Sequence, residues 1–512
     1  MKNFRRKAFC LLLTAALLFS ALLTACSSTA GLSSSSSASS SKKSSSSKAS
    51  STAQSSSSAA RKVLLLPYVY GKSLNPLLTD SLTNAQLWPL VYDCLAEPDA
   101  NFNPVFRLAS AVSSQGTTAT VTLRSGLVFS DGSSLTSADV VATYNQVLSN
   151  ASGYFYGKVA NIAGVSAQGR TTVVFTLKTP DPLFANLLDI PIVKSGTGVS
   201  DIPVGSGRYV PGGSSSNLTL SWNSRWYQGG SPALTQIRLI NVPDQSTLAS
   251  SLEIGNIDYL QTDYGEGSYS AVNVKSQTLT LSQLCFLGVN TAHSPLNNVH
   301  FRRALFYALD RRDLVTDAFS GRASATDIPF FPGLSGVSKA TPDNLSAHAE
   351  KAQSELKQSG AATGTSLTLL VNQENTARVT AANSVVTAFG KYGIAIKVVQ
   401  LSMSDYASRI AQGNFDLYLG EIRLTDNMDL SPFLNQGGAA NAGVPANTQT
   451  LAAYTAWRNG SGTLAQVTDA FRSEVPFIPI CCRDGSVSFQ SGLTGVAATE
   501  NNLFFNVESW HF

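Results

Sequence analysis

The pattern of apolar and polar positions divides residues 61–512 into a strand-rich first part and an α/β second part. The first part opens with an uninterrupted apolar run, Val63–Tyr70, which predicts a buried strand. Strict alternation over 118–123 and 172–177 is typical of half-buried antiparallel strands. Further elements predicted in this part are a helix over Asn84–Leu95, a helix that begins at Ser137, and a strand over Ile237–Val242.

The second part alternates apolar strands with amphipathic helices. The strands are predicted over Leu367–Val371, Ile394–Leu401, Phe415–Gly420 and Phe477–Cys482, and the helices over Phe301–Asp310, Lys351–Leu356 and Val379–Tyr392. This βαβ-type order predicts an α/β fold. The body is too long for one core, so we expect two or three compact units.

The N-terminal segment predicts export and a lipid anchor. Four basic residues within Lys2–Lys7 precede an apolar run, Ala8–Leu22, that is too short for a comfortable membrane span. The run ends in Leu23-Thr24-Ala25-Cys26, the arrangement that a lipoprotein signal peptidase reads before the cysteine is acylated. Residues 1–25 are therefore interpreted as a lipoprotein signal peptide and Cys26 as the lipidated residue. The alternative is a plain signal peptide followed by an incidental cysteine.

Residues 26–60 predict a flexible tether, because they are nearly all Ser, Ala, Thr and Lys and lack apolar periodicity. A chain of this kind reaches roughly 30 Å, enough to hold a globular body just off a membrane surface. Removal of the signal peptide lowers the count of Lys and Arg from 36 to 32, which balances the 32 Asp and Glu. The mature chain is therefore neutral, and no basic face for nucleic acid is expected.

The cysteines and histidines do not predict a metal site. Without Cys10 and Cys26, four cysteines remain, at positions 94, 285, 481 and 482, and none forms a C-x-x-C pair. One disulfide or buried free thiols are both compatible with an exported protein. The four histidines lack ligand spacing apart from one loose pair, so we expect no metal and no cofactor.

Seven phrases then follow one another in a specific order. They are SLNPL (73–77), VYDCL (91–95), VTLRSGLVFSDG (121–132), LTSADV (135–140), VGSGRY (204–209), LEIGNID (252–258) and FRRALFYALDR (301–311). The ordered set resembles the extracellular solute-binding proteins of peptide and nickel importers, the oligopeptide- and dipeptide-binding family, over nearly all of 61–512. Several of these residues have a structural interpretation: Asp131-Gly132 marks a turn, Asp139 lies near a helix start, and Arg302, Arg303 and Asp310 are expected on a solvated or salt-bridged helix face.

The resemblance implies a two-lobed, periplasmic-binding-protein-like α/β fold with an extra strand-rich subdomain in lobe 1. Its expected boundaries are 61–96, 203–283 and 484–512 for lobe 1, 97–202 for the subdomain, and 284–483 for lobe 2. It also implies a monomer that closes around a short peptide or another small solute and delivers it to the transmembrane subunits of an ABC permease. With lipid on Cys26, the protein is expected on the extracytoplasmic side of the cell membrane.

The most informative segment for ligand binding is the loop after the Phe415–Gly420 strand. Loops at the carboxyl ends of strands bind ligands in open α/β sheets. In the dipeptide-binding relatives the matching loop carries an aspartate that pairs with the ligand's α-ammonium, and this position falls on Asp426. A buried ammonium needs such a counter-charge, because desolvation costs several kcal/mol per ion. The alternative is that Asp426 and Asn427 only shape a turn.

The same loop departs from the relatives at two positions. They tend to have a tryptophan at Arg423 and a proline at Leu430. The sequence therefore does not determine whether this chain has the aromatic wall or the loop geometry of those relatives. An arginine at position 423 provides a bidentate fork for a carboxylate or a phosphate. The ligand class is less determined by the sequence than the fold.

Two further segments are candidates for ligand contact. The loop 79–84, with Asp80, Leu82 and Thr83, corresponds to one that meets the ligand backbone in oligopeptide-binding relatives. Arg483 follows the last predicted strand, where the chain should cross back between the lobes, although a surface position is the usual one for an arginine. Trp88, Tyr92 and Trp457 are assigned either to the cavity wall or to the core.

The sequence gives no support to an enzyme. It contains no Gly-x-Ser-x-Gly elbow, no Walker-type loop and no His-Glu-x-x-His motif. Within the binding-protein interpretation, a metal chelate or a glycan competes with a peptide as the solute. A peptide-sensing receptor of the same fold, which passes no ligand to an importer, is the alternative from another class. A cell-surface hydrolase would require turnover of a bound peptide.

Overall fold

The computed structural model describes residues 61–78, 80–214, 216–264, 274–339, 342–441, 443 and 448–512. They belong to one compact unit, Ala59–Phe512. The predicted signal peptide, Cys26 and the tether lie outside the described residues. No helix among the described residues is long and apolar enough to cross a membrane.

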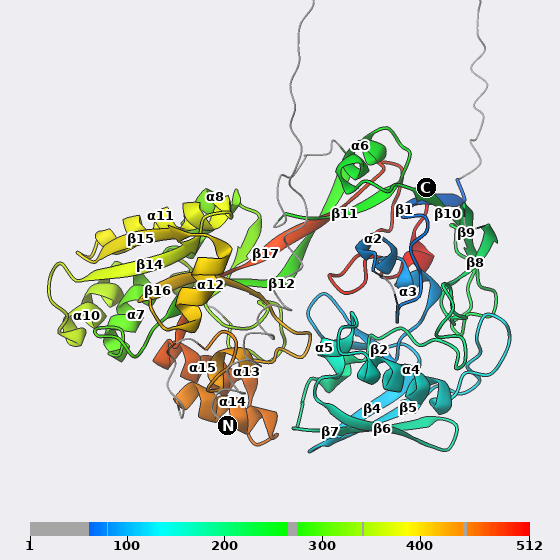
Figure 1. The fold of residues 1–512 in the computed structure, drawn as a ribbon, viewed down its shortest axis with the longest axis horizontal. Helices are drawn as coiled ribbons and strands as arrows, with labels where there is room; N and C mark the ends of the chain where they lie inside the picture. Colours follow the sequence, from blue (N-terminus) through cyan, green and yellow to red (C-terminus); the bar gives the residue numbers. More distant parts are fainter. Residues whose placement is uncertain are drawn as a thin grey trace, which may run out of the picture. The chain divides into compact units, whose positions relative to one another are not determined.

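Lobe 1 contains two four-stranded sheets and a small hairpin around one hydrophobic core. The first sheet has the order β1-β10-β9-β8, from Val63–Tyr68, Gln236–Asn241, Asn217–Trp222 and Tyr209–Ser214. The second has the order β4-β5-β7-β6, from Ala109–Gln115, Thr118–Leu123, Thr172–Leu177 and Ile162–Gln168. The hairpin joins β2 (Ala96–Pro98) to β3 (Pro104–Phe106). The second sheet forms the strand-rich part of this lobe (Figure 1).

The alternation in the sequence explains how the second sheet packs. Ala119 pairs with Phe175 and Val121 with Val173, and all four side chains are fully buried. The helix α4 (Ser137–Ser149) covers this buried face, and its Tyr144 ring lies edge-on to Phe175 with centroids 4.9 Å apart. The helix begins with a capping box between Thr136 and Asp139, which satisfies backbone N–H groups of the first turn. The predicted strands over 118–123 and 172–177 are confirmed.

Lobe 2 is centred on a mixed sheet of the order β11-β17-β12-β16-β14-β15, with β13 paired to β17. The strands are β11 (Tyr259–Asp263), β12 (Lys275–Val289), β13 (Ala323–Ala325), β14 (Ser366–Asn372), β15 (Ala395–Leu401), β16 (Leu417–Arg423) and β17 (Phe477–Phe489). β14 is parallel to both β15 and β16. This is the α/β part that the second half of the sequence predicts.

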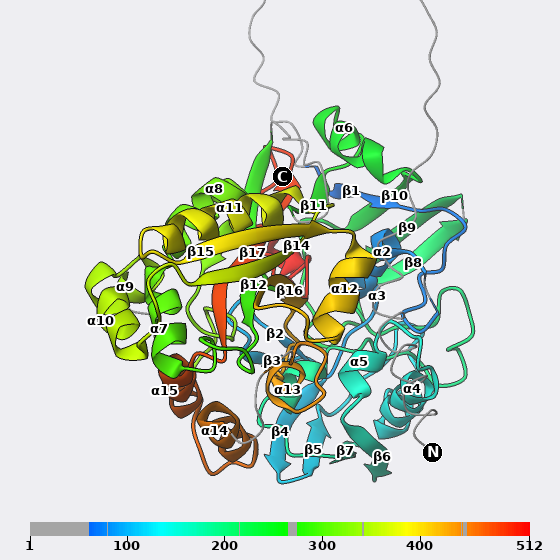
Figure 2. The same cartoon turned by 60° about the vertical axis from the view of Figure 1, so that its left-hand side comes forward.

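Two groups of helices cover opposite faces of this sheet. One face carries α7 (Val299–Ala308), α8 (Arg311–Phe319), α10 (Ala349–Ser359) and α11 (Thr376–Gly390). The other carries α12 (Met403–Ala411), α14 (Gln449–Arg458) and α15 (Leu464–Glu474). Figure 2 shows α11 and α12 on the two sides of β14 and β15. Each face therefore has its own hydrophobic core.

The long strands β12 and β17 connect the lobes. In β12, Leu279 and Leu281 belong to the core of lobe 1, whereas Leu284 and Leu287 belong to the cores of lobe 2. The register between β12 and β17 shifts between Thr280 and Leu284, at the point where the ribbon passes from one core to the other. An interrupted ladder bends more readily than a continuous one, so this point is where a hinge is expected. The ribbon is visible between the two lobes in Figure 1.

Two expectations from the sequence are wrong. The helix predicted over Asn84–Leu95 is two single turns, α2 (Leu82–Ala85) and α3 (Trp88–Val91), and Pro89 lies in the first turn of the second, where its missing N–H is harmless. The expected solvated or salt-bridged helix face is wrong for Arg302, which is buried and donates hydrogen bonds to the backbone carbonyls of Leu296 and Val475. A buried guanidinium is tolerated when carbonyl oxygens satisfy its N–H groups.

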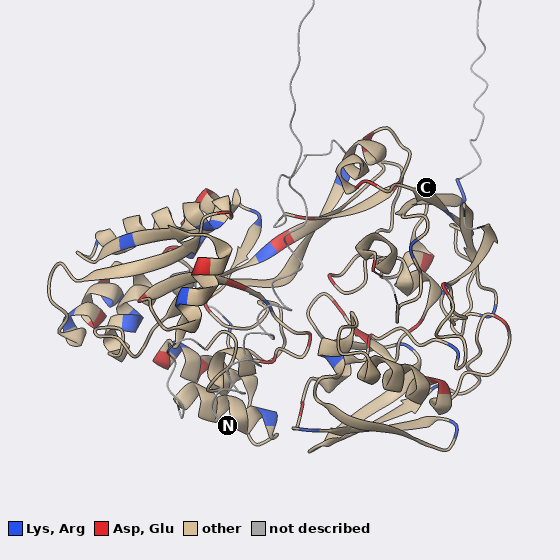
Figure 3. Cartoon of the chain, viewed as in Figure 1, with Lys and Arg blue, Asp and Glu red and all other residues tan. Residues whose placement is uncertain are grey.

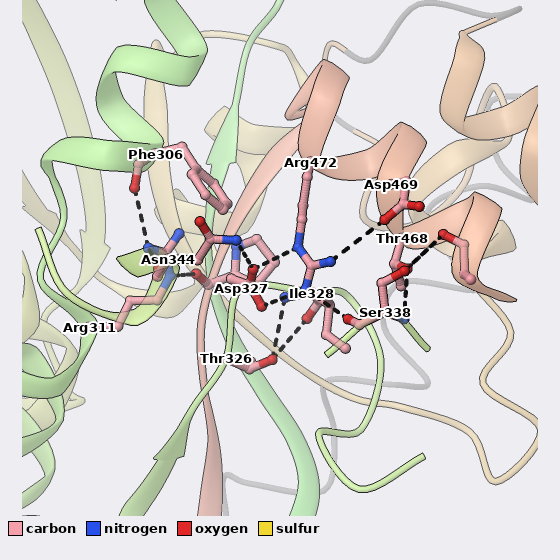
Figure 4. Close-up of polar contacts among 12 residues, drawn as sticks. Phe306, Arg311, Thr326, Asp327, Ile328, Ser338, Asn344, Thr468, Asp469 and Arg472 are labelled. Atoms are coloured by element: carbon pink, nitrogen blue, oxygen red, sulfur yellow. Dashed lines mark hydrogen bonds and ion pairs between the residues drawn. The ribbon is translucent and has the colours of Figure 1, made fainter. Parts of the chain in front are cut away.

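Lobe 2 also contains a buried network around Asp327, shown in Figure 4. Arg472 Nε lies 2.7 Å from Asp327 Oδ2, and Asn344 Nδ2 donates to the same oxygen at 2.8 Å. Arg311, which is fully buried, donates to the carbonyl oxygens of Asn344 and Phe306 at 2.8 and 3.2 Å. The network joins α8, α9 (Pro342–Leu345) and α15 in the interior of the lobe.

Over the described residues, acidic and basic side chains are interspersed rather than segregated on one face (Figure 3). This distribution agrees with the neutral charge of the predicted mature chain. It gives no electrostatic footprint for a polyanion within the described part.

Candidate functional site

Arg423, the last residue of β16, presents a charged side chain where the lobes meet. Its side chain is 63% exposed, and Nη2 lies 2.9 Å from Glu500 Oε1, a residue of lobe 1. Burial by the surrounding protein opposes the charged form, but Glu500 and then Asp426 outweigh it and raise the pKa of Arg423. The guanidinium is thus accessible to water and lies beside a carboxylate of the other lobe.

Glu500 is held in place by the connecting ribbon. Its Oε2 accepts a hydrogen bond from the backbone N–H of Ser282 at 2.7 Å, and its Oε1 accepts one from Ser282 Oγ at 2.9 Å. Burial raises the pKa of Glu500, while Arg423 acts in the opposite direction. Arg423 is therefore oriented by a carboxylate that is itself fixed at the point where β12 leaves the core of lobe 2.

A second cationic group lies on the same face of β16. Residues two apart in a strand share a face, so Glu421 and Arg423 point to the same side. Glu421 binds Arg378 of α11 at 3.0 Å and Arg483 of β17 at 3.3 Å. Burial alone would raise the pKa of Glu421, but the two arginines outweigh it and hold the pKa below its usual value. Two guanidinium groups around one carboxylate leave one positive charge in excess.

The position of this cluster matches the carboxyl edge of the parallel strands. Arg378 is in the first turn of α11, which follows β14 and begins at Thr376 after the cap Asn375. The N–H groups at a helix start favour an anion. The buried Nε of Arg483 has no hydrogen-bond partner among the described residues. The cluster Arg378–Glu421–Arg483 is thus chemically suited to receive a carboxylate.

The Asp426 carboxylate is already paired with a lysine of lobe 1. Lys158 Nζ, from α5 (Tyr156–Val159), lies 2.5 Å from Asp426 Oδ2 and also forms an ion pair with Asp189. Burial would lower the pKa of Lys158, but the two carboxylates outweigh it and raise the pKa. Burial raises the pKa of Asp189, although Lys158 opposes the shift. The predicted role of Asp426 as acceptor of a ligand's ammonium stays a prediction.

Neighbouring contacts tie the same loop to lobe 1. Asn427 Nδ2 donates to Asp181 Oδ2 at 2.6 Å, and Asn186 Nδ2 donates to the carbonyl oxygen of Asp426 at 3.2 Å. Arg458 Nη1 of α14 binds the other oxygen of Asp181 at 3.1 Å. The loop after β16 is therefore part of the contact between the lobes, and Asn427 is buried within it.

The predicted residues of the 79–84 loop differ in exposure. Asp80 forms an exposed ion pair with Lys72 at 2.5 Å, Leu82 is 51% exposed at the start of α2, and Thr83 is buried. Gln86 follows α2, and its Nε2 donates to Gln261 Oε1 of β11 at 3.0 Å. The side chains of Asp80 and Leu82 are therefore both accessible to a partner, whereas that of Thr83 is not. A role for these residues in ligand contact stays a prediction.

A cavity of about 300 Å³ lies between the lobes, and Glu500 is part of its wall. Its wall includes Asn101 and Thr499 of lobe 1, Thr280 of the ribbon, and Phe331 of lobe 2. None of the ligand-binding residues predicted from the sequence lines it, but Glu500 does. The volume is at the lower end of the range for small-molecule pockets. The cavity shows that the lobes do not pack completely against each other at this point.

The three candidate aromatic residues belong to the cores. Trp88 and Tyr92 are buried in lobe 1, and Trp457 is buried in lobe 2. An exposed aromatic residue near them is Tyr154, which is 59% exposed and packs edge-on against Trp88 with ring centroids 5.2 Å apart. Its phenol also contributes to the electrostatic environment of Arg423.

Sequence reasoning missed the partners that shape the site: Lys158, Asp189, Arg378, Glu421 and Glu500. Glu421 carried a weak signal, because it lies two residues before Arg423 in the strand that leads to the predicted loop. The other four are far away in the sequence, and no local pattern connects them with this loop. Among the described residues no group of three or more His, Cys, Asp or Glu could hold a metal ion, and the cysteines at 94, 285, 481 and 482 are free thiols.

The two lobes, the crossing ribbon and the charged residues between the lobes define a solute-binding protein of the two-lobed class. The family of bacterial extracellular solute-binding proteins, family 5 (middle), matches residues 103–443. The chain belongs to this family. Its members are substrate-binding proteins of transport systems.

The chain is similar to the glutathione-binding protein GsiB of Salmonella paratyphi A, with 28% identity over 297 residues, which cover 53% of this chain and 56% of that protein. It thus spans about half the length of the curated relatives that it matches. Two solved structures share the fold. The periplasmic murein tripeptide-binding protein MppA, in an unliganded open form, has a TM-score of 0.76 and 18% identity over 89% of this chain and 98% of that one. A nickel ABC transporter protein of Bacillus halodurans has a TM-score of 0.72 and 17% sequence identity, and the match covers 86% of this chain and 98% of that one.

Proposed function

We propose that this protein is a lipoprotein of an ABC importer that captures a short peptide between its lobes and delivers it to a permease. The lipid on Cys26 would anchor it to the extracytoplasmic face of the membrane through the tether of residues 26–60. The proposal is supported by the family, by relatives whose names include glutathione and a murein tripeptide, and by the lipoprotein pattern at Leu23–Cys26.

The observation that carries the proposal is the exposed guanidinium of Arg423 between the lobes. Glu500 of lobe 1 is its ion-pair partner, and the Arg378–Glu421–Arg483 cluster adds positive charge on the same face of β16. A bidentate guanidinium fits the carboxylate of a peptide. In the proposed complex, the peptide carboxylate binds these arginines and the peptide backbone contacts the Asp80–Thr83 segment of lobe 1.

Closure follows from a ligand that contacts both lobes. A ligand shifts an equilibrium between open and closed forms only by its difference in affinity for the two. A peptide held by Arg423 on one side and by the α2 segment on the other gains its second set of contacts only in the closed form. The bend required by closure would take place at the register shift between Thr280 and Leu284.

The test uses the same peptides with a free or an amidated C-terminus. Native mass spectrometry of the purified protein would first identify retained peptides, and isothermal titration calorimetry would then compare the two forms. We expect amidation to weaken binding 10- to 100-fold, because the charge-assisted hydrogen bonds to Arg423 are lost. The variant Arg423→Gln should lose this discrimination, while Arg238→Gln, an exposed arginine of β10, should keep it. Absence of peptide binding, with binding of a metal chelate or a glycan instead, would contradict the proposal.

Delivery to a permease requires a cellular test. Cells that lack the protein should fail to take up the identified peptide, and the wild-type chain should restore uptake. Cys26→Ala should release the protein from the membrane and reduce uptake, while its purified form binds peptide with unchanged affinity. Normal uptake in cells without the protein would instead favour a sensor of the same fold.

A further inference from the structure

Lys158 satisfies the Asp426 carboxylate within the protein itself. Its ammonium lies 2.5 Å from Asp426 Oδ2 and is shared with Asp189. The side chains of Asp426 and Asp189 are 9% and 11% exposed, and that of Lys158 is 23% exposed. A carboxylate with so little access to water requires a counter-charge, and here a lysine supplies it without any ligand.

The surroundings hold Lys158 and Asp426 at this distance. Asn186 fixes the backbone of Asp426, and Asp181 fixes the side chain of Asn427. A tethered ammonium has a high effective concentration at its partner, in the millimolar range or above for flexible tethers and higher when the tether is ordered. A ligand's ammonium would have to displace Lys158 in order to bind the Asp426 oxygen that it occupies.

We propose that Lys158 is a specificity-determining residue, which occupies Asp426 in place of a ligand ammonium and so admits peptides whose amino end is acylated or otherwise uncharged. This inference rests on the proposed function. The inference is about the amino end of the peptide, whereas the proposed binding by Arg423 and the Arg378–Glu421–Arg483 cluster is about its carboxyl end. A free α-ammonium would gain nothing at Asp426 that offsets its own desolvation and the displacement of Lys158.

The experiment compares the same peptide with a free and an N-acetylated amino end by calorimetry. We expect the wild-type protein to bind the acetylated form as tightly as the free form or more tightly. Lys158→Met should shift the ratio of the two affinities at least 10-fold toward the free amine, because Asp426 then loses the ammonium that is bound to it directly. A merely structural role of Lys158 would weaken both forms alike and leave the ratio unchanged, which would overturn the inference.

Three further variants keep the result interpretable. Lys158→Arg retains the charge and should keep the wild-type ratio. Lys158→Met/Asp189→Asn removes one of the two carboxylates that would otherwise remain unpaired, and should show the same shift if the single variant does not fold. Lys194→Met removes a lysine paired with Asp131 elsewhere in lobe 1 and is the control that should leave the ratio unchanged.

The outcomes separate this inference from the proposed function. If the wild-type protein binds the free amine 10-fold or more tightly than the acetylated form, the role of Lys158 is overturned while peptide binding stands. If the protein binds neither the free nor the acetylated amine, and binds neither the free nor the amidated carboxyl end, the proposed peptide binding is overturned. The inference about Lys158 is then overturned with it.

Discussion

Asp181 of lobe 1 accepts a hydrogen bond from Asn427 of lobe 2 at 2.6 Å, although 246 residues separate them in the chain. The same carboxylate binds Arg458 at 3.1 Å, and its side chain is completely buried. These contacts link the strand-rich part of lobe 1 to the loop after β16 without any ligand. They therefore influence how readily the lobes separate.

Asp181→Ala should favour the open form of the ligand-free protein. The change leaves Arg458 without its carboxylate, and loss of one partner of a buried ion pair costs about 3–5 kcal/mol. Small-angle scattering should show a larger radius of gyration and calorimetry a lower Tm. Asp201→Ala, at an exposed aspartate, is the control. A radius of gyration equal to that of the wild type would show that other contacts keep the lobes together.

Arg472→Met should destabilise lobe 2 through Asp327. The carboxylate of Asp327 is fully buried, and Arg472 Nε is 2.7 Å away, so the variant leaves a buried charge with Asn344 as its remaining side-chain partner in the network of Figure 4. We expect a loss of about 3–5 kcal/mol in the free energy of unfolding, measured by urea denaturation. Asp469→Ala removes an exposed partner of Arg472 at 3.8 Å and should change stability by less than about 1 kcal/mol. Equal losses in the two variants would contradict this account.

Asp93→Asn should make the stability of the protein less dependent on pH. Burial raises the pKa of Asp93 to about 6, while Arg208 and Arg107 oppose the shift. The folded state then binds the proton more tightly than the unfolded state, so the contribution of Asp93 to stability is present at low pH and is lost as the pH rises toward 6. The loss should be about 3 kcal/mol, from about 1.4 kcal/mol per pKa unit.

The measurement for Asp93 is a series of urea denaturations between pH 4 and pH 7. The decrease in stability over this range should be smaller in Asp93→Asn than in the wild type. Asp131→Asn is the control and should leave the slope over this range nearly unchanged, because Lys194 holds the pKa of the Asp131 carboxyl below its usual value and its contribution is lost only at lower pH. A wild-type slope in Asp93→Asn would show that this carboxyl does not titrate as described.

Glu500→Gln should increase affinity for peptides with a free carboxylate. Glu500 neutralises Arg423 at 2.9 Å, and a glutamine can still accept the hydrogen bond from the Ser282 backbone. Without the competing carboxylate, we expect about 3- to 10-fold tighter binding of the free acid and unchanged binding of the amide, in keeping with the energy of a charge-assisted hydrogen bond. Weaker binding of both forms would indicate that Glu500 mainly positions the ribbon.

The sequence determined those parts of the fold that depend on local patterns. β5 and β7 have the predicted bounds because the alternation over 118–123 and 172–177 forces one face of each strand into the core. Apolar spacing over 84–95 predicted one continuous helix. It could not show that the segment is divided, with Pro89 in the first turn of a second helix, α3. β17 runs seven residues beyond the predicted strand, to Phe489, since its second half pairs with β11 and with the first half of β12, where the sheet packs on the core of lobe 1.

The ordered phrases between residues 73 and 311 identified the family, and the loop after β16 was correctly placed at the end of a strand of the sheet. Only the tertiary structure decided the partners of its charges. Lys158 is 268 residues from Asp426, and Arg378 and Arg483 reach Glu421 from different elements. Hydrophobic periodicity is a property of a few consecutive residues, whereas an ion pair depends on where the fold brings distant side chains together.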